Sequence, residues 1–135
     1  MNVQSYPHAQ PNSSLIAVTH AVYALHAVSL CIGAFSAASV VGSFLFGWPS
    51  LIAVLLNYAM RRDARGTWLD SHFSWQIRTF WHAVAISVPL ALISIILAPI
   101  LVGFATWIVG FFVIGIWASV RIVRGWMRLS SGRDI

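Results

Sequence analysis

The charged residues of this chain lie in two short clusters, and long uncharged runs precede and separate them. The clusters cover 61–78 and 121–134, and the uncharged runs cover 15–60 and 79–120. As single helices these runs would be about 69 and 63 Å long, whereas the hydrocarbon core of a bilayer is about 30 Å thick. Each run is therefore long enough to cross the membrane twice. The pattern predicts an all-α polytopic membrane protein with four transmembrane helices arranged as two hairpins.

Turn-forming residues divide the two runs. The predicted helices cover 15–35, 39–62, 74–97 and 100–124. We place the second turn at Ala98-Pro99, because proline is poorly placed to continue a helix. If the first turn were at Gly47-Trp48-Pro49, only residues 50–60 would remain for the second helix, which would be too short to cross the membrane. The first turn is therefore placed near 36–39, and Pro49 is interpreted as a kink inside the second helix.

The ends of the chain are predicted to lie outside the helices. Residues 1–14 are polar and unpatterned, so we expect a flexible tail in which Ser13 or Ser14 caps the first helix. The four-helix transmembrane domain is expected over 15–128, followed by a tail at 129–135.

The arginines predict the orientation. All eight basic residues are Arg, and all of them lie in the two clusters. Four crossings would bring the amino-terminal tail, the central loop and the carboxyl end to one side, whereas an odd number would separate the clusters. By the positive-inside rule that side is cytoplasmic. Both termini are therefore expected in the cytoplasm of a multi-pass protein of the bacterial inner membrane.

Composition agrees with a membrane protein and limits the chemistry. Apolar residues make up 59% of the chain and charged residues 8%, which leaves little material for a soluble domain. Cys31 is the only cysteine, so neither an intramolecular disulfide nor an all-cysteine metal site can form. Three carboxylates and no nucleophile–base pattern argue against an enzyme.

The first cluster contains the densest set of polar side chains. Helical spacing places five aromatic or polar residues on one face: Trp68, His72, Trp75, Thr79 and His82. One interpretation is an interfacial helix with its Trp rings at headgroup level. The functional alternative is an interaction surface or polar entrance lined by four residues: Asp70, His72, Gln76 and Arg78. Arg78, about one turn inside its helix, is expected to snorkel, to pair with Asp70 or to face a wet cavity.

The second cluster forms a stripe. Arg121, Arg124 and Arg128 follow Trp117 at steps of four, three and four residues, so they share one helical face. We expect this face to bind anionic lipid headgroups. Nucleic acid is not expected as a partner, because eight arginines are few and most are needed near the membrane.

The membrane histidines are the only cofactor candidates. His26 and His82, from two helices at comparable depth, could flank a b-type haem, but packed and hydrogen-bonded histidines are the favoured interpretation. No cofactor is therefore predicted. Small residues at Gly103, Gly110 and Gly115 predict close helix packing within one chain, with contact in a homo-oligomer as the alternative.

The central stretch carries a family resemblance. An apolar helix over 51–60 leads into Arg61-Arg62-Asp63, and then come 68–73, 75–78 and the later segment 121–125. This order resembles a family of small bacterial membrane proteins of unknown function, which is distantly similar to the four-helix membrane subunit of the chloroplast inner-envelope protein translocon. The resemblance implies a four-helix domain with both ends cytoplasmic, and it implies no activity.

These observations predict a non-catalytic interaction or assembly module, or an accessory subunit of a larger membrane complex. Two alternatives stay open. One is a small oligomeric transporter or channel component whose path is lined by Gln76, Arg78 and His82. The other is an electron carrier with haem b at His26 and His82.

Overall fold

The computed structural model describes residues 9–35, 47–100 and 102–135. The described elements are α1 (Ser13–Phe35), α3 (Trp48–Met60), α4 (Leu69–Leu97), a short 3-10 turn η1 (Ala98–Ile100) and α5 (Val102–Ser130). Helices account for all the regular elements among these residues, apart from one isolated parallel bridge between Ala9 and Thr67. The chain is therefore all-α, as expected.

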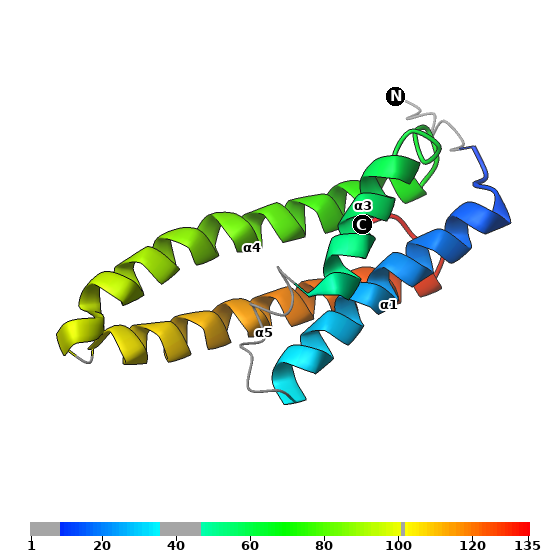
Figure 1. The fold of residues 1–135 in the computed structure, drawn as a ribbon. Helices are drawn as coiled ribbons and strands as arrows, with labels where there is room; N and C mark the ends of the chain where they lie inside the picture. Colours follow the sequence, from blue (N-terminus) through cyan, green and yellow to red (C-terminus); the bar gives the residue numbers. More distant parts are fainter. Residues whose placement is uncertain (1–8, 36–46, 101) are drawn as a thin grey trace, which may run out of the picture.

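Helices α4 and α5 form a long antiparallel hairpin that η1 closes (Figure 1). Each has 29 residues, so each is about 44 Å long. Gly103 lets the two arms meet at the turn, because a Cβ there would lie 2.7 Å from the Cα of Ala98. Gly110 does the same further along, where a Cβ would lie 2.6 Å from a methyl group of Leu90. Both glycines therefore occupy positions of close helix packing.

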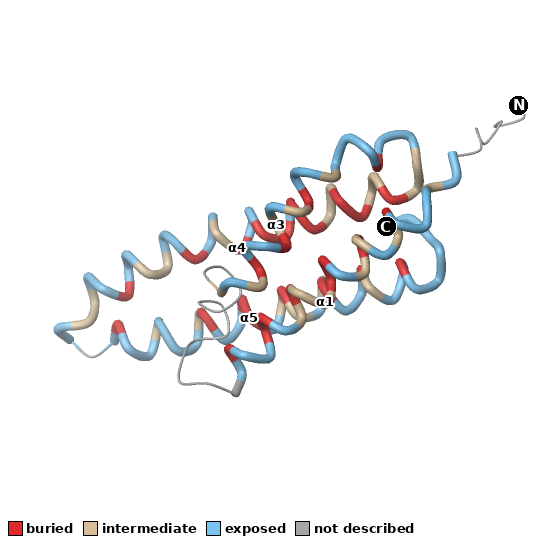
Figure 2. The backbone as a smooth tube through the Cα atoms, turned by 45° about the vertical axis from the view of Figure 1, so that its right-hand side comes forward, coloured by how far each residue is buried: buried red, intermediate tan, exposed pale blue. Residues whose placement is uncertain are grey.

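Helices α1 and α3 pack against only one half of this hairpin. Figure 1 shows both of them at the end that carries the termini, while the parts of α4 and α5 nearest η1 extend beyond them. Buried residues follow the inward sides of the helices, and the outward sides are exposed (Figure 2). The core at the shared end includes Tyr23, Leu69, Phe73, Ala118 and Ile122.

Three helical segments are long and apolar enough to cross a membrane: Ser13–Ala34, Leu69–Ile100 and Val102–Ser130. Helix α3 is also apolar, but its 13 residues reach only about 20 Å, against about 30 Å for the hydrocarbon core. The structure therefore supports a membrane protein with three span candidates and one shorter apolar helix.

The prediction for the second helix, 39–62, is wrong over its described first part. Gly47 is extended, with φ −68° and ψ 136°, and the helix begins at Trp48. Pro49 therefore lies in the first turn, where its missing N–H costs no helical bond, and not at an interior kink. The predicted turn near 36–39 lies outside the described residues.

The side chain that caps α1 also differs from the prediction. Asn12 Oδ1 accepts a hydrogen bond of 2.6 Å from the Ser14 backbone N–H, and the Asn12 carbonyl accepts from Leu15 and Ile16. Asparagine is among the best N-cap residues, so Asn12 takes the role expected of Ser13 or Ser14. Helix α4 begins five residues before its predicted start at 74, and α5 ends six residues after its predicted end at 124.

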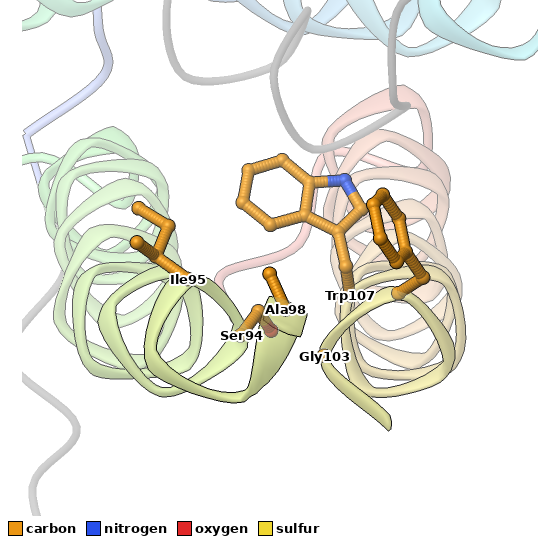
Figure 3. A pocket seen from close by; sticks show the side chains of 6 residues that line it. Ser94, Ile95, Ala98, Gly103 and Trp107 are labelled. Atoms are coloured by element: carbon orange, nitrogen blue, oxygen red, sulfur yellow. The ribbon is translucent and has the colours of Figure 1, made fainter. Parts of the chain in front are cut away.

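A hollow of about 230 Å³ lies at the closed end of the hairpin. It is lined by Ser94, Ile95, Ala98, Gly103, Phe104 and Trp107. Figure 3 shows the Trp107 ring reaching from α5 over this space. The lining is almost entirely apolar, so the hollow has little capacity to hold a polar ligand.

Candidate functional site

The amino-terminal segment, the loop between α3 and α4, and the carboxyl-terminal segment meet at one end of the bundle. The Ala9 N–H donates to the Gly66 carbonyl at 3.2 Å, which joins the first described residue to the loop. The Ile135 N–H donates to the Ser71 hydroxyl at 3.1 Å, which joins the last residues to α4. All eight arginines lie at this end of the bundle, either in the loop or in the adjoining parts of α4, α5 and the carboxyl-terminal segment.

A sharp turn at Gly132 directs the carboxyl-terminal segment back onto α4. The Arg133 N–H donates to the Arg128 carbonyl at 3.0 Å, and the Gly132 N–H donates to the Leu129 carbonyl at 2.9 Å. This pair of bonds is a Schellman motif, and it requires the positive φ of 64° that glycine adopts readily. The turn brings the Arg133 carbonyl to the start of α4.

His72 connects that carbonyl to α1. Its Nε2 lies 2.7 Å from the Arg133 carbonyl oxygen, and its Nδ1 lies 3.0 Å from the Tyr23 hydroxyl. Because a carbonyl can only accept, Nε2 carries the proton. In the neutral ring Nδ1 is then the acceptor for the Tyr23 O–H. The His72 side chain is fully buried, so this chain of two bonds ties α1, α4 and the tail together inside the core.

Two buried carboxamides lie in the same part of the bundle. Gln76 is one turn after His72 on α4, and Asn57 is one turn before the end of α3. Both are almost completely buried, and the side-chain nitrogen and oxygen atoms of Asn57 have no hydrogen-bond partner among the described residues. The Gln76 carboxamide does lie close to the Tyr23 hydroxyl. Buried amides of this kind are costly unless solvated, so they mark an internal polar region.

A second polar network joins α4 to α5. The Arg121 Nε donates to the Thr79 hydroxyl at 2.8 Å, and that hydroxyl donates to the Trp75 carbonyl at 2.7 Å. The Trp75 indole N–H donates back to the Arg121 carbonyl at 3.3 Å. The guanidinium carbon of Arg121 also lies 3.6 Å from the centre of the Trp75 ring and 5.2 Å from that of Trp117. Hydrogen bonds and cation–π contact therefore hold the Arg121 side chain in one orientation.

The predicted polar entrance does not form as one surface. His72 and Gln76 are buried in the core, Asp70 is half-buried, and Arg78 is exposed. Arg78 Nε donates to the Ser74 carbonyl at 3.3 Å, and no ion pair between described residues joins it to Asp70. Of the three situations expected for Arg78, pairing with Asp70 is not observed: the Arg78 side chain turns along its own helix, and its charge remains exposed.

The predicted lipid-binding stripe is divided. Arg124 and Arg128 are exposed as expected, and Arg128 also donates to the Asp134 carbonyl at 3.1 Å. Arg121 instead turns toward α4, as its contacts with Trp75 and Thr79 show. The division arises because α4 covers one side of the stripe, which helical spacing on α5 alone cannot reveal.

The haem candidates lie in different surroundings. His26 is fully buried, with Nδ1 2.8 Å from the Ser50 hydroxyl at the contact between α1 and α3. His82 is exposed on α4, and its Nδ1 donates to the Arg78 carbonyl at 2.6 Å. The two imidazoles therefore do not face a shared space for a haem. Within the described residues no group of three or more His, Cys, Asp or Glu side chains could hold a metal ion.

Sequence reasoning missed several residues that are buried in the bundle. Tyr23, Asn57, Gly125 and Ser50 were not candidates, and Thr79 was only one member of a helical face. Ser50 lies in the first turn of α3, where a backbone N–H has no partner within the helix. Its N–H donates instead to the Ser29 hydroxyl of α1 at 3.2 Å. Polar residues within otherwise apolar helices were the signal that could have identified Tyr23, Asn57 and Ser50.

Comparison with models of known protein families, with curated proteins and with solved structures found no match to this chain.

Proposed function

We propose that this chain is a multi-pass protein of a bacterial inner membrane that acts as a non-catalytic interaction or assembly module, or as an accessory subunit of a larger membrane complex. The observation that carries the proposal is the part of the α4–α5 hairpin near η1, which neither α1 nor α3 covers. Its outward side chains are large and apolar. Those more than half exposed include Leu92, Ile95, Ile96, Phe104, Ile108, Val109 and Phe112.

This apolar hairpin needs an apolar environment. Contiguous exposed surface of this kind on a protein marks a membrane or a protein interface. Both arms, 79–97 and 102–120, contain no charged residue, and at a rise of about 1.5 Å per residue each would be about 28 Å long. That length matches a hydrocarbon core of about 30 Å. The hairpin therefore suits a bilayer, where an apolar helix of a partner could replace lipid along it.

The orientation also belongs to the proposal. The arginines at the end that joins both termini favour a cytoplasmic location for that end, and the opposite turn Ala98–Ile100 has no charge. The resemblance to small bacterial membrane proteins stays a prediction that agrees with this orientation.

The arrangement of the polar side chains favours a module over the two alternatives. Gln76 is buried while Arg78 and His82 are exposed, so these residues do not line one path for transport. His26 and His82 do not face one another for haem. The bonds of Tyr23, His72 and Arg121 instead join one helix to another, which supports a scaffold role.

Site-specific photo-crosslinking in native membranes tests the proposal. We expect a photoreactive residue at Ile96, which is 74% exposed, to give a discrete adduct with another protein, whereas one at the buried Ala83 should give none. Lipid adducts alone at Ile96 would contradict the module. Adducts only between copies of this chain would favour the oligomeric transporter, and a Soret band from the purified protein would favour the haem carrier. Release of the chain by alkaline carbonate would contradict membrane insertion itself.

A further inference from the structure

Three arginines gather where α4 and α5 meet. Arg78 lies between Trp75 and Thr79 on α4, and both of those residues contact Arg121 of α5. Arg124 follows Arg121 by one turn. Both Arg78 and Arg124 are close enough to Arg121 for their charges to repel its guanidinium. Three neighbouring positive charges of this kind attract an anion.

The central guanidinium is already oriented for binding. Arg121 donates from Nε to Thr79, and its guanidinium carbon lies 3.6 Å from the centre of the Trp75 ring, so these two contacts hold the guanidinium in place. Its two terminal nitrogens make no hydrogen bond to another described residue, so they remain free to donate. A planar guanidinium with two parallel N–H groups fits two oxygens of a phosphate better than it fits a single-atom anion.

The position of the three arginines along the proposed membrane-spanning arms indicates that the phosphate belongs to a lipid headgroup. Arg78 immediately precedes the uncharged arm 79–97, and Arg121 immediately follows the uncharged arm 102–120. If these arms fill the hydrocarbon core, both guanidinium groups lie at its boundary, which is the level of lipid headgroups. Trp75 and Trp117 lie beside Arg121 at the same level, where Trp side chains are enriched in membrane proteins.

We propose that Arg78, Arg121 and Arg124 form a binding site for the phosphate of an anionic phospholipid headgroup at the junction of α4 and α5. This inference rests on the proposed membrane location, and it differs from the lipid stripe expected from the sequence. Arg78 of a second helix replaces Arg128, and Arg121 acts as an oriented donor and not as a diffuse surface charge. The lipid would bridge the two arms of the hairpin on the cytoplasmic side.

Native mass spectrometry of the purified protein tests the site, with phosphatidylglycerol as the probe and phosphatidylcholine as the reference lipid. The double variant Arg78→Gln/Arg124→Gln removes two exposed charges that the fold does not use for contacts between helices. Its matched control is Arg61→Gln/Arg62→Gln, which removes two exposed charges from the loop. We expect phosphatidylglycerol binding to weaken about fivefold per arginine in the first variant, which corresponds to about 1 kcal/mol each. The control should change less than about twofold, in line with the small effect of distant surface charges.

A second variant tests the orientation of the central residue. Arg121→Lys keeps the charge but removes the planar pair of donors, so we expect it to weaken phosphatidylglycerol binding by about fivefold as well, the loss expected for one headgroup contact. The site would be overturned if phosphatidylglycerol binding were unchanged in both Arg78→Gln/Arg124→Gln and Arg121→Lys. An equal loss of binding in the control Arg61→Gln/Arg62→Gln would also overturn it. Inorganic phosphate in excess should not displace the lipid. If it does so and binds alone, the site takes a soluble anion and the lipid assignment is wrong.

The two proposals can fail separately. If alkaline carbonate releases the wild-type chain from membranes, the proposed membrane function fails whatever the binding data show. If the chain stays in the membrane and binds both lipids equally, only the headgroup site is overturned.

Discussion

The ring of Tyr23 occupies the space that a side chain on Gly125 would need. A Cβ added at Gly125 would lie 2.7 Å from Cε1 and 2.8 Å from Cζ of Tyr23, and closer still to its hydroxyl oxygen. Helix α5 therefore needs glycine at this position to let α1 present Tyr23 to His72. One missing side chain on α5 thus makes room for the hydrogen bond between α1 and α4.

Gly125→Ala should consequently destabilise the bundle. Overpacking of a filled core costs about 1–3 kcal/mol, and the thermal unfolding midpoint in detergent should fall accordingly. Val123→Ala, at an exposed position two residues earlier, is the matched control and should change little. Tyr23→Phe removes the atom nearest the new methyl group, so the double variant Tyr23→Phe/Gly125→Ala should be more stable than the sum of the single effects. An unchanged midpoint in Gly125→Ala would show that α1 can move away at no cost.

His72→Phe should release the carboxyl-terminal segment as well as weaken the core. The change leaves the Arg133 carbonyl and the Tyr23 hydroxyl without their partner, at a cost of about 1–3 kcal/mol for each group that stays buried. Trypsin cleavage after Arg133, followed by mass spectrometry, measures the release directly. His82→Phe changes an exposed histidine on the same helix and should leave cleavage at Arg133 as in the wild type. Equal cleavage in the two variants would argue against the role of His72.

Arg121 should contribute to stability through Trp75 and Thr79 in the absence of added lipid. Arg121→Gln removes the cation–π contact and a hydrogen bond, so we expect a loss of about 1–2 kcal/mol in unfolding measurements in zwitterionic detergent. Arg124→Gln removes the same charge from an exposed position and should have a smaller effect. A larger loss in Arg124→Gln would mean that charge, and not the contact with α4, sets the stability.

Asp70 and Arg78 should act independently. They share no ion pair among the described residues, and the Arg78 side chain bonds to Ser74 instead. The effects of Asp70→Asn and Arg78→Gln on thermal stability should therefore add within about 0.5 kcal/mol in a double-mutant cycle. Coupling well above that value would restore the pairing that the sequence suggested.

Reporter fusions test the orientation. A reporter that is active only in the periplasm should be inactive after Ile135 and active after Pro99, because all the arginines lie at the end opposite Pro99. A reporter that is active only in the cytoplasm is the control and should give the reverse pattern. Activity of the periplasmic reporter after Ile135 would contradict the proposed cytoplasmic location of the carboxyl end.

The predictable parts of the fold are those that charge and length determine. The long uncharged run 79–120 with Ala98-Pro99 at its centre correctly predicted the α4–α5 hairpin. The start of α3 was missed, because requiring every helix to cross the bilayer forced Pro49 into a helix interior. The structure instead has a short helix, whose first turn accommodates the proline and donates a hydrogen bond from the Ser50 backbone N–H to the Ser29 hydroxyl of α1.

The candidate site was harder to predict, because helical spacing within one element does not show which neighbour covers it. The spacing placed Arg121 with Arg124 and Arg128, but α4 covers Arg121 and leaves the others exposed. The pairing of His72 with Tyr23 and Arg133 joins residues that are 49 and 61 positions apart. Such contacts depend on how the helices assemble, and a single sequence contains no periodic signal for them.

The separation of His72 from Arg133 has a consequence for biogenesis. The His72 imidazole on α4 is synthesised 61 residues before Arg133, whose carbonyl its Nε2 contacts in the folded protein. At a synthesis rate of about 5–20 residues per second, that partner emerges about 3–12 s later. During this interval the His72 proton needs water, a lipid headgroup or an insertion factor as a temporary acceptor. Helices α1, α3 and α4 are therefore expected to remain loosely assembled until the whole of α5 has been made.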